Sequence, residues 1–167
     1  MPVLGWVGWI LVLGRVADGA VIPRNEAAVA AVDQGLTDVA FADAWGFDPR
    51  DATAALQGAI DSKARTVIVP FTGSPWVIRP VTLRSDLELI LEAGVVVLAK
   101  SGEFLGGGDS LFRATDGTNI TIRGQGATLR MRKKDYQNPP YPKAEWRMGL
   151  ALGGCRNVLV DGLRIES

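Results

Sequence analysis

After residue 64 the chain consists of short apolar runs, many of which alternate apolar with polar residues. A two-residue period of this kind is typical of a β-strand. Pro, Gly or Asp ends the runs, and no helical pattern lies between them, which argues against a doubly wound sheet. The predicted strands are residues 66–69, 76–78, 81–83, 87–91, 95–98, 111–114, 120–123, 127–131, 150–152, 158–160 and 163–165.

The strand-rich part contains an internal repeat. Residues 119–124 (NITIRG) recur as residues 157–162 (NVLVDG), and residues 86–94 are a weaker relative. A small apolar strand precedes each full copy, and an apolar–polar strand follows it. A unit of strand, turn, strand and turn cannot bury its inner apolar face alone. The face becomes buried only when the unit stacks on neighbouring units. The repeat therefore predicts an all-β solenoid.

Two helices are predicted before the first of these strands. Residues 26–34 are Ala-rich and end before a glycine, so they indicate a short helix. The second helix spans residues 49–62, with Asp48 as its cap and Pro49 at its first position. One apolar stripe runs along it, at Ala52, Leu56, Ala59 and Ile60. An amphipathic helix at this place would cover the open first coil of a solenoid.

The N-terminus is apolar over residues 3–13, and small residues follow at 16–20. This run is too short to span a bilayer but matches the hydrophobic region of a secretory signal. No Lys or Arg precedes it, so a misassigned start or a segment at the membrane surface is the alternative. We therefore divide the chain into a predicted signal or apolar segment at residues 1–20, a lead-in with a short helix at 21–47, and the first coils of the solenoid at 48–167. The expected location is secreted, periplasmic or at the cell surface.

Composition excludes several kinds of chemistry. The chain has 18 Lys and Arg against 18 Asp and Glu, so its net charge does not favour nucleic acid. It has no histidine, which removes His general bases and His-ligated zinc. Cys155 is the one cysteine, so the chain has no disulfide framework. We expect this thiol to be a small buried side chain.

The segment between the repeat copies, residues 130–147, is the candidate binding site. Its three prolines forbid a regular ladder, so we expect an inserted loop, and loops on a rigid scaffold often carry binding sites. Aromatic and basic side chains together would suit an acidic sugar. The candidate residues are Arg132, Lys134, Tyr136, Tyr141, Trp146 and Arg147. In the alternative interpretation, Tyr141 and Trp146 pin the loop to the body and its basic residues are merely solvated.

No catalytic or metal-binding residue is assigned. The glycine-rich stretches at 106–109 and 124–129 lack the residues of a phosphate or dinucleotide loop. The carboxylates of the strand-rich region form no obvious close pair of the kind that glycoside hydrolysis needs. Asp161 follows a strand at the position that Arg123 occupies in the other copy, so a turn role is favoured.

Residues 43–129 resemble the N-terminal region of the pectate-lyase-like and polygalacturonase-like right-handed β-helix proteins. Residues 46–61 (GFDPRDATAALQGAID) are similar to the capping helix of that superfamily. Further matches follow in the order of the chain, at residues 66–70 (TVIVP), 73–78 (GSPWVI), 80–85 (PVTLRS), 92–98 (EAGVVVL) and 119–126 (NITIRGQG). The chain departs from the pattern at Phe47, where a second glycine-aspartate turn is common, and at Gly58 inside the helix.

The resemblance implies a right-handed parallel β-helix with an N-terminal amphipathic capping helix. It also implies an exported protein that acts on a polysaccharide, such as a uronic-acid polymer, by lyase or hydrolase chemistry. Calcium is implied as a cofactor by the resemblance alone. Catalytic residues of that superfamily lie mostly on later coils, so we expect a chain truncated at its C-terminal end and inactive by itself. A non-catalytic binding or adhesive module is the alternative, and the sequence leaves the oligomeric state open.

Overall fold

A computed structural model describes residues 19–143 and 146–166 of the chain. Within these residues the fold consists mostly of parallel β-sheet, with two α-helices, α1 (Glu26–Asp33) and α2 (Thr53–Asp61), and two 3-10 helices, η1 (Ala42–Trp45) and η2 (Asp135–Gln137). The strands are β1 (Val39–Phe41), β2 (Thr66–Val69), β3 (Trp76–Ile78), β4 (Val81–Thr82), β5 (Leu87–Leu91), β6 (Val96–Ala99), β7 (Ser110–Thr115), β8 (Thr118–Arg123), β9 (Thr128–Arg130), β10 (Met148–Gly153), β11 (Arg156–Asp161) and β12 (Arg164–Glu166).

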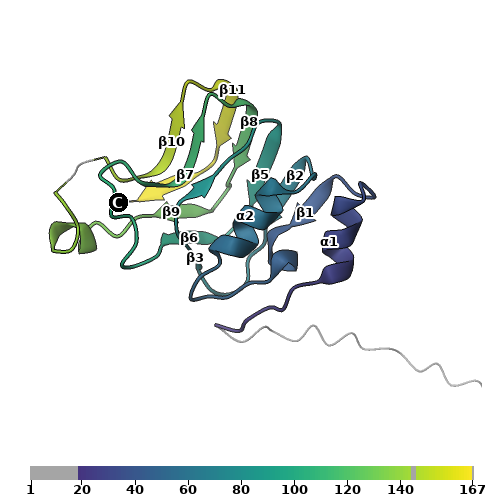
Figure 1. Ribbon diagram of the computed structural model, residues 1–167, viewed down its shortest axis with the longest axis horizontal. Coiled ribbons are helices and arrows are strands. Elements are labelled where there is room, and N and C mark those ends of the chain that lie inside the picture. Colours follow the sequence, from purple (N-terminus) through teal and green to yellow (C-terminus); the bar gives the residue numbers. More distant parts are fainter. Residues whose placement is uncertain (1–18, 144–145, 167) are drawn as a thin grey trace, which may run out of the picture.

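The strands of the described residues form three sheets, and their orders are interleaved. The sheets run β1-β2-β5-β8-β11, β10-β7-β4 and β12-β9-β6-β3. From β2 onward, each strand pairs with the strand three places further along the chain, and every pairing between named strands is parallel. Figure 1 shows α1 and β1 at one end of this arrangement and β10 and β11 at the other.

The sequence repeat is the pairing unit of the sheets. Ile120 of the first copy pairs with Val158 of the second, and Arg123 pairs with Asp161. The strands before and after the two copies pair as well, β7 with β10 and β9 with β12. All eleven predicted strands are present with bounds within two residues of those predicted, so the strand prediction is confirmed.

The apolar sides of the three sheets share one core. In the longest sheet Val67, Leu89 and Ile122 are in register on adjacent strands, and none of them is exposed to solvent. Trp76 and Leu129 from another sheet and Phe112 from the third belong to the same buried cluster. Strands such as β3 and β5 contribute alternate side chains to the interior, as their two-residue period predicted, whereas all six residues of β11 are exposed.

Helix α2 adds its predicted apolar stripe to this core, since Leu56, Ala59 and Ile60 are fully buried. Its start differs from the prediction. The helix begins at Thr53, and the Asp48 carboxylate instead accepts the N–H of Arg50 in a turn. The N–H of Ala52 donates to the carbonyl of Val77 on β3 at 2.7 Å. This bond to a neighbouring strand keeps the residues before Thr53 out of the helix.

Gly58 of α2 lies against the ring of Trp45. A Cβ atom at this position would be 2.6 Å from Trp45 Cδ1. Gly58 is therefore a place of close packing, where a side chain would force the indole to move. Helix α1 follows the prediction for residues 26–34, with Asn25 accepting the N–H of Ala28 as its cap.

Strand β1 was not predicted. It pairs in parallel with β2, and its residues Val39 and Phe41 are exposed while Ala40 is buried. A three-residue strand offers too short a pattern to recognise from the sequence. No helix in the described part of the chain is long and apolar enough to cross a membrane. The predicted signal, residues 1–20, lies almost wholly outside the described residues.

Candidate functional site

Three cationic side chains follow three adjacent strands of one sheet. Arg79 follows β3, Lys100 follows β6, and Arg132 comes two residues after β9. Ile78 pairs with Ala99, and Leu98 pairs with Arg130, so the same register places Arg79 beside Lys100 and Lys100 beside Arg132. Adjacent strands lie about 4.8 Å apart. We call these three residues the basic column.

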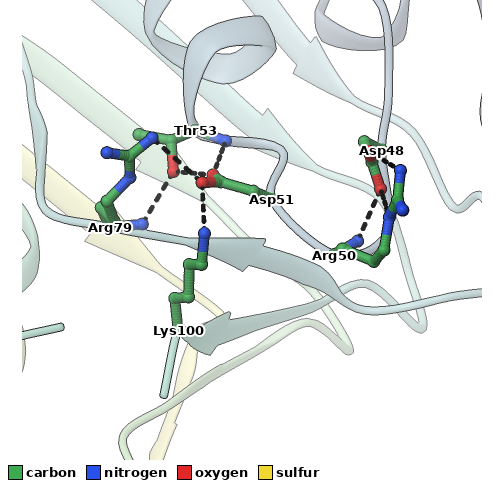
Figure 2. A network of polar contacts seen from close by, with 6 residues as sticks. All are labelled: Asp48, Arg50, Asp51, Thr53, Arg79 and Lys100. Atoms are coloured by element: carbon green, nitrogen blue, oxygen red, sulfur yellow. Dashed lines mark hydrogen bonds and ion pairs between the residues drawn. The ribbon is translucent and has the colours of Figure 1, made fainter. Parts of the chain in front are cut away.

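One carboxylate, that of Asp51, neutralises part of the basic column (Figure 2). Its Oδ2 atom lies 2.7 Å from Lys100 Nζ and 3.0 Å from Arg79 Nη2. Its Oδ1 atom accepts the backbone N–H of Thr53 at 3.1 Å and the Thr53 hydroxyl at 2.5 Å. The Thr53 hydroxyl in turn accepts the N–H of Arg79 at 2.8 Å. The start of α2 is thereby joined to the ends of β3 and β6.

These contacts control the ionisation of Asp51. Burial alone would raise the pKa of this carboxyl, since 22% of its side chain is exposed. The hydrogen bonds from Lys100 and Thr53 and the charge of Arg79 outweigh burial and lower the pKa to about 2. Asp51 is therefore a carboxylate at any physiological pH.

An open groove of about 340 Å³ continues from the basic column. We call it the basic groove. It is lined by Leu98, Arg130, Met131, Arg132, Lys133, Lys134, Asp135 and Glu166. Two carboxylates face four cations there, and the hydrogen bond from Arg130 to Glu166, at 2.7 Å, lowers the pKa of Glu166. The lining therefore carries an excess of positive charge, which would attract an anionic ligand.

Three of the candidate residues form an anchor for the inserted loop. The rings of Tyr136 and Tyr141 meet edge to face with centroids 5.0 Å apart. The guanidinium of Arg147 lies 5.0 Å from the first centroid and 5.5 Å from the second. Arg147 is only 8% exposed, and its Nε donates to the carbonyl of Phe104 at 2.7 Å. The Tyr141 hydroxyl accepts the N–H of Gly102 at 2.7 Å, and burial raises the pKa of the Tyr136 hydroxyl.

The other three candidate residues are placed differently. Lys134 is exposed in the basic groove, and Trp146 is 69% exposed. Arg132 lines the basic groove, but its Nε also donates to the carbonyl of Ala99 at 2.6 Å. The alternative interpretation therefore fits Tyr141, which holds the loop to the body. It does not fit Trp146, which is exposed, or Arg147, which is buried rather than solvated.

Sequence reasoning did not find Arg79, Lys100 or Asp51. A signal was present, because a basic residue follows the apolar end of a strand in Ile78-Arg79 and again in Ala99-Lys100. Recognising the basic column also requires the pairing register, which the sequence alone does not supply. Among the described residues, no group of three or more Asp, Glu and Cys side chains is arranged to hold a metal ion.

Comparison with known proteins gives no relative. No family model, no curated protein and no solved structure matches the chain.

Proposed function

We propose that the three sheets are the faces of a right-handed parallel β-helix of the pectate-lyase-like and polygalacturonase-like class, with α2 covering its first coil. The interleaved strand order supports this proposal, because a chain that visits three sheets in turn pairs every strand with the third one after it. The in-register stacking of the sequence repeat supports it as well.

We further propose that the basic groove binds an acidic polysaccharide, such as a uronic-acid polymer, on an exported carbohydrate-active protein. The basic column carries the proposal. The Asp51 carboxylate is paired with two of the column's three cations, Arg79 and Lys100. The third, Arg132, lines the groove, where Arg130, Lys133 and Lys134 extend the positive surface. Cations one strand spacing apart repel each other, and the carboxylates of a uronic-acid chain would relieve this repulsion. Guanidinium groups are well suited to carboxylates because they bind them through two parallel hydrogen bonds.

Turnover is a separate question from binding. A lyase or glycoside hydrolase and a non-catalytic binding or adhesive module would both need such a groove. Incubating the chain with polygalacturonate and alginate, and assaying both unsaturated uronate and new reducing ends, tests for turnover. Product release would favour the enzyme, while binding without release is the result expected of this chain under both alternatives, because no catalytic residue is assigned in it.

Calorimetric titration with oligogalacturonate at low and high sodium chloride tests the binding proposal. We expect binding that weakens as salt rises, because exposed charges are screened. Reversing the charge of Lys134 (Lys134→Glu) should weaken binding roughly five- to tenfold, which corresponds to about 1 kcal/mol. Lys143→Glu is the matched control, since Lys143 is exposed on the same loop but does not line the groove. Absence of binding at low salt, or equal affinities of the two variants, would contradict the proposal.

A further inference from the structure

A second groove lies on the sheet that contains β5, β8 and β11, and it is built around a ladder of side chains. Asn119 on β8 and Asn157 on β11 are at equivalent positions, and the same register places Asp86, directly before β5, beside Asn119; all three have positive φ angles between 52° and 57°. Asn157 Nδ2 donates to Asn119 Oδ1 at 2.7 Å, and Asn119 Nδ2 donates to Asp86 Oδ1, also at 2.7 Å. Asn and Asp tolerate this left-handed conformation better than other non-glycine residues. The ladder therefore has a fixed geometry.

The ladder forms one side of a groove of about 460 Å³, which we call the ladder groove. Its lining consists of Arg65, Asp86, Leu87, Glu88, Asn119, Thr121, Asn157 and Leu159. Glu88, Thr121 and Leu159 are in register on adjacent strands and form a second row beside the ladder. Leu159 is 46% exposed. An apolar surface thus lies next to amide, hydroxyl and carboxylate groups.

The charges of the ladder groove nearly cancel. Glu88 is paired with Arg123 at 3.0 Å. Of the remaining charged groups in the lining, Arg65 and Asp86 have opposite signs. In contrast to the basic groove, this surface offers no excess of cations, and the exposed Asp86 carboxylate would repel an anion. Its spare hydrogen-bonding capacity lies in side-chain amides, a threonine hydroxyl, a carboxylate and a guanidinium, which together both donate and accept.

We infer that the ladder groove is a second glycan-binding site, for a neutral polysaccharide chain. Adjacent hydroxyl groups of a sugar each donate and accept, which matches the mixed donors and acceptors of the ladder. The apolar face of the sugar ring would lie against Leu159. Regular spacing of the groove residues along the sheet suits a ligand that is itself a repeating polymer. This site lies on a different sheet from the basic groove and does not depend on the function proposed for it.

The inference is tested by titrating the full chain with cellohexaose, xylohexaose and mannohexaose. Saturation-transfer NMR and calorimetry are used to detect binding. We expect at least one hexasaccharide to bind with an affinity that is insensitive to sodium chloride. Arg65→Ala should weaken that binding roughly three- to tenfold through the loss of hydrogen bonds from a charged group. Arg113→Ala is the matched control, because Arg113 is an exposed arginine on β7, outside this groove. Circular dichroism would verify that both variants fold.

Three results would overturn the inference. The first is a lack of binding by all three hexasaccharides. The second is equal affinity of the Arg65→Ala and Arg113→Ala variants. The third is loss of hexasaccharide binding in Lys134→Glu, which would place the neutral sugar in the basic groove instead. Hexasaccharide binding that survives Lys134→Glu and weakens in Arg65→Ala supports a second site.

Discussion

The basic groove and the ladder groove are two outer surfaces of the same stack of strands, yet they differ in charge. In each, strand pairing places equivalent residues side by side. In the ladder groove this stacking joins Asp86, Asn119 and Asn157 by hydrogen bonds. In the basic column, from which the basic groove continues, it brings together like charges, Arg79 and Lys100, which are neutralised by Asp51 from outside the sheet. The difference shows that strand register places equivalent side chains in a row. The residue types in that row then decide whether the side chains bond to one another or need a partner from elsewhere.

The largest effect we predict comes from disrupting the hydrophobic core that lies beneath both grooves. Leu89 of β5 is fully buried between Val67 and Ile122. Leu89→Ala should lower the free energy of unfolding by about 2–5 kcal/mol, because it removes buried methyl groups and leaves a cavity. Urea denaturation monitored by circular dichroism measures this change. Acidic and neutral glycan binding should both fall in proportion to the folded fraction.

The neighbouring residue provides the control for this experiment. Ile90 alternates with Leu89 on β5 and is only partly buried. Ile90→Ala should therefore lower the free energy of unfolding clearly less than Leu89→Ala does. If Leu89→Ala eliminated binding at one groove and left the other at full affinity, the two surfaces would not share a common core.

A smaller effect is predicted for the neutralising carboxylate. Asp51→Asn should lower the free energy of unfolding at neutral pH by about 1 kcal/mol, since its partners are partly exposed to solvent. The folded-state pKa of Asp51 is lowered to about 2, against about 3.9 for an unfolded chain. Its stabilising contribution is therefore complete above about pH 4 and is lost as the pH falls toward 2. Denaturation curves across this range should show a weaker dependence on pH in Asp51→Asn than in the wild-type chain.

The same substitution should sharpen the contrast between the grooves. Without the Asp51 carboxylate the basic column becomes more positive, so oligogalacturonate should bind more tightly while a neutral hexasaccharide binds unchanged. Asp48→Asn is the control, because Asp48 also has a pKa lowered to about 2, by its hydrogen bonds with Arg50, but lies away from the column. Equal gains in affinity from both substitutions would mean that net charge matters rather than the place of the carboxylate.

What the sequence predicted depends on how local each signal is. The strands and the repeat follow from periodicity within a few residues, and the pairing of Ile120 with Val158 was already implied by the repeat. The predicted start of α2 was wrong despite good local signals at Asp48 and Pro49. The N–H of Ala52 donates to the carbonyl of Val77 on β3, and this bond competes with the local signals.

In the candidate sites, too, local features could be predicted from the sequence and contacts between distant residues could not. The inserted loop could be located by its prolines and basic residues. That Arg147 is buried against Tyr136 and Tyr141 could not be predicted, because it depends on how the loop folds back on itself. Arg79 and Asp51 are distant in sequence and come together only through the placement of α2 against the strands. Position along the chain was therefore predictable, whereas the identity of interacting partners was not.

The smallest effect we predict isolates a single hydroxyl group. Thr121 lies in the row between Glu88 and Leu159 and lines the ladder groove. Thr121→Val retains the branched shape that suits a strand but removes a donor and acceptor. Neutral hexasaccharide binding should weaken about two- to fivefold, in line with the loss of one neutral hydrogen bond, while oligogalacturonate binding and the unfolding midpoint stay the same. Unchanged hexasaccharide affinity would place the sugar away from this row, and a matching loss of oligogalacturonate binding would mean that the two grooves are not independent.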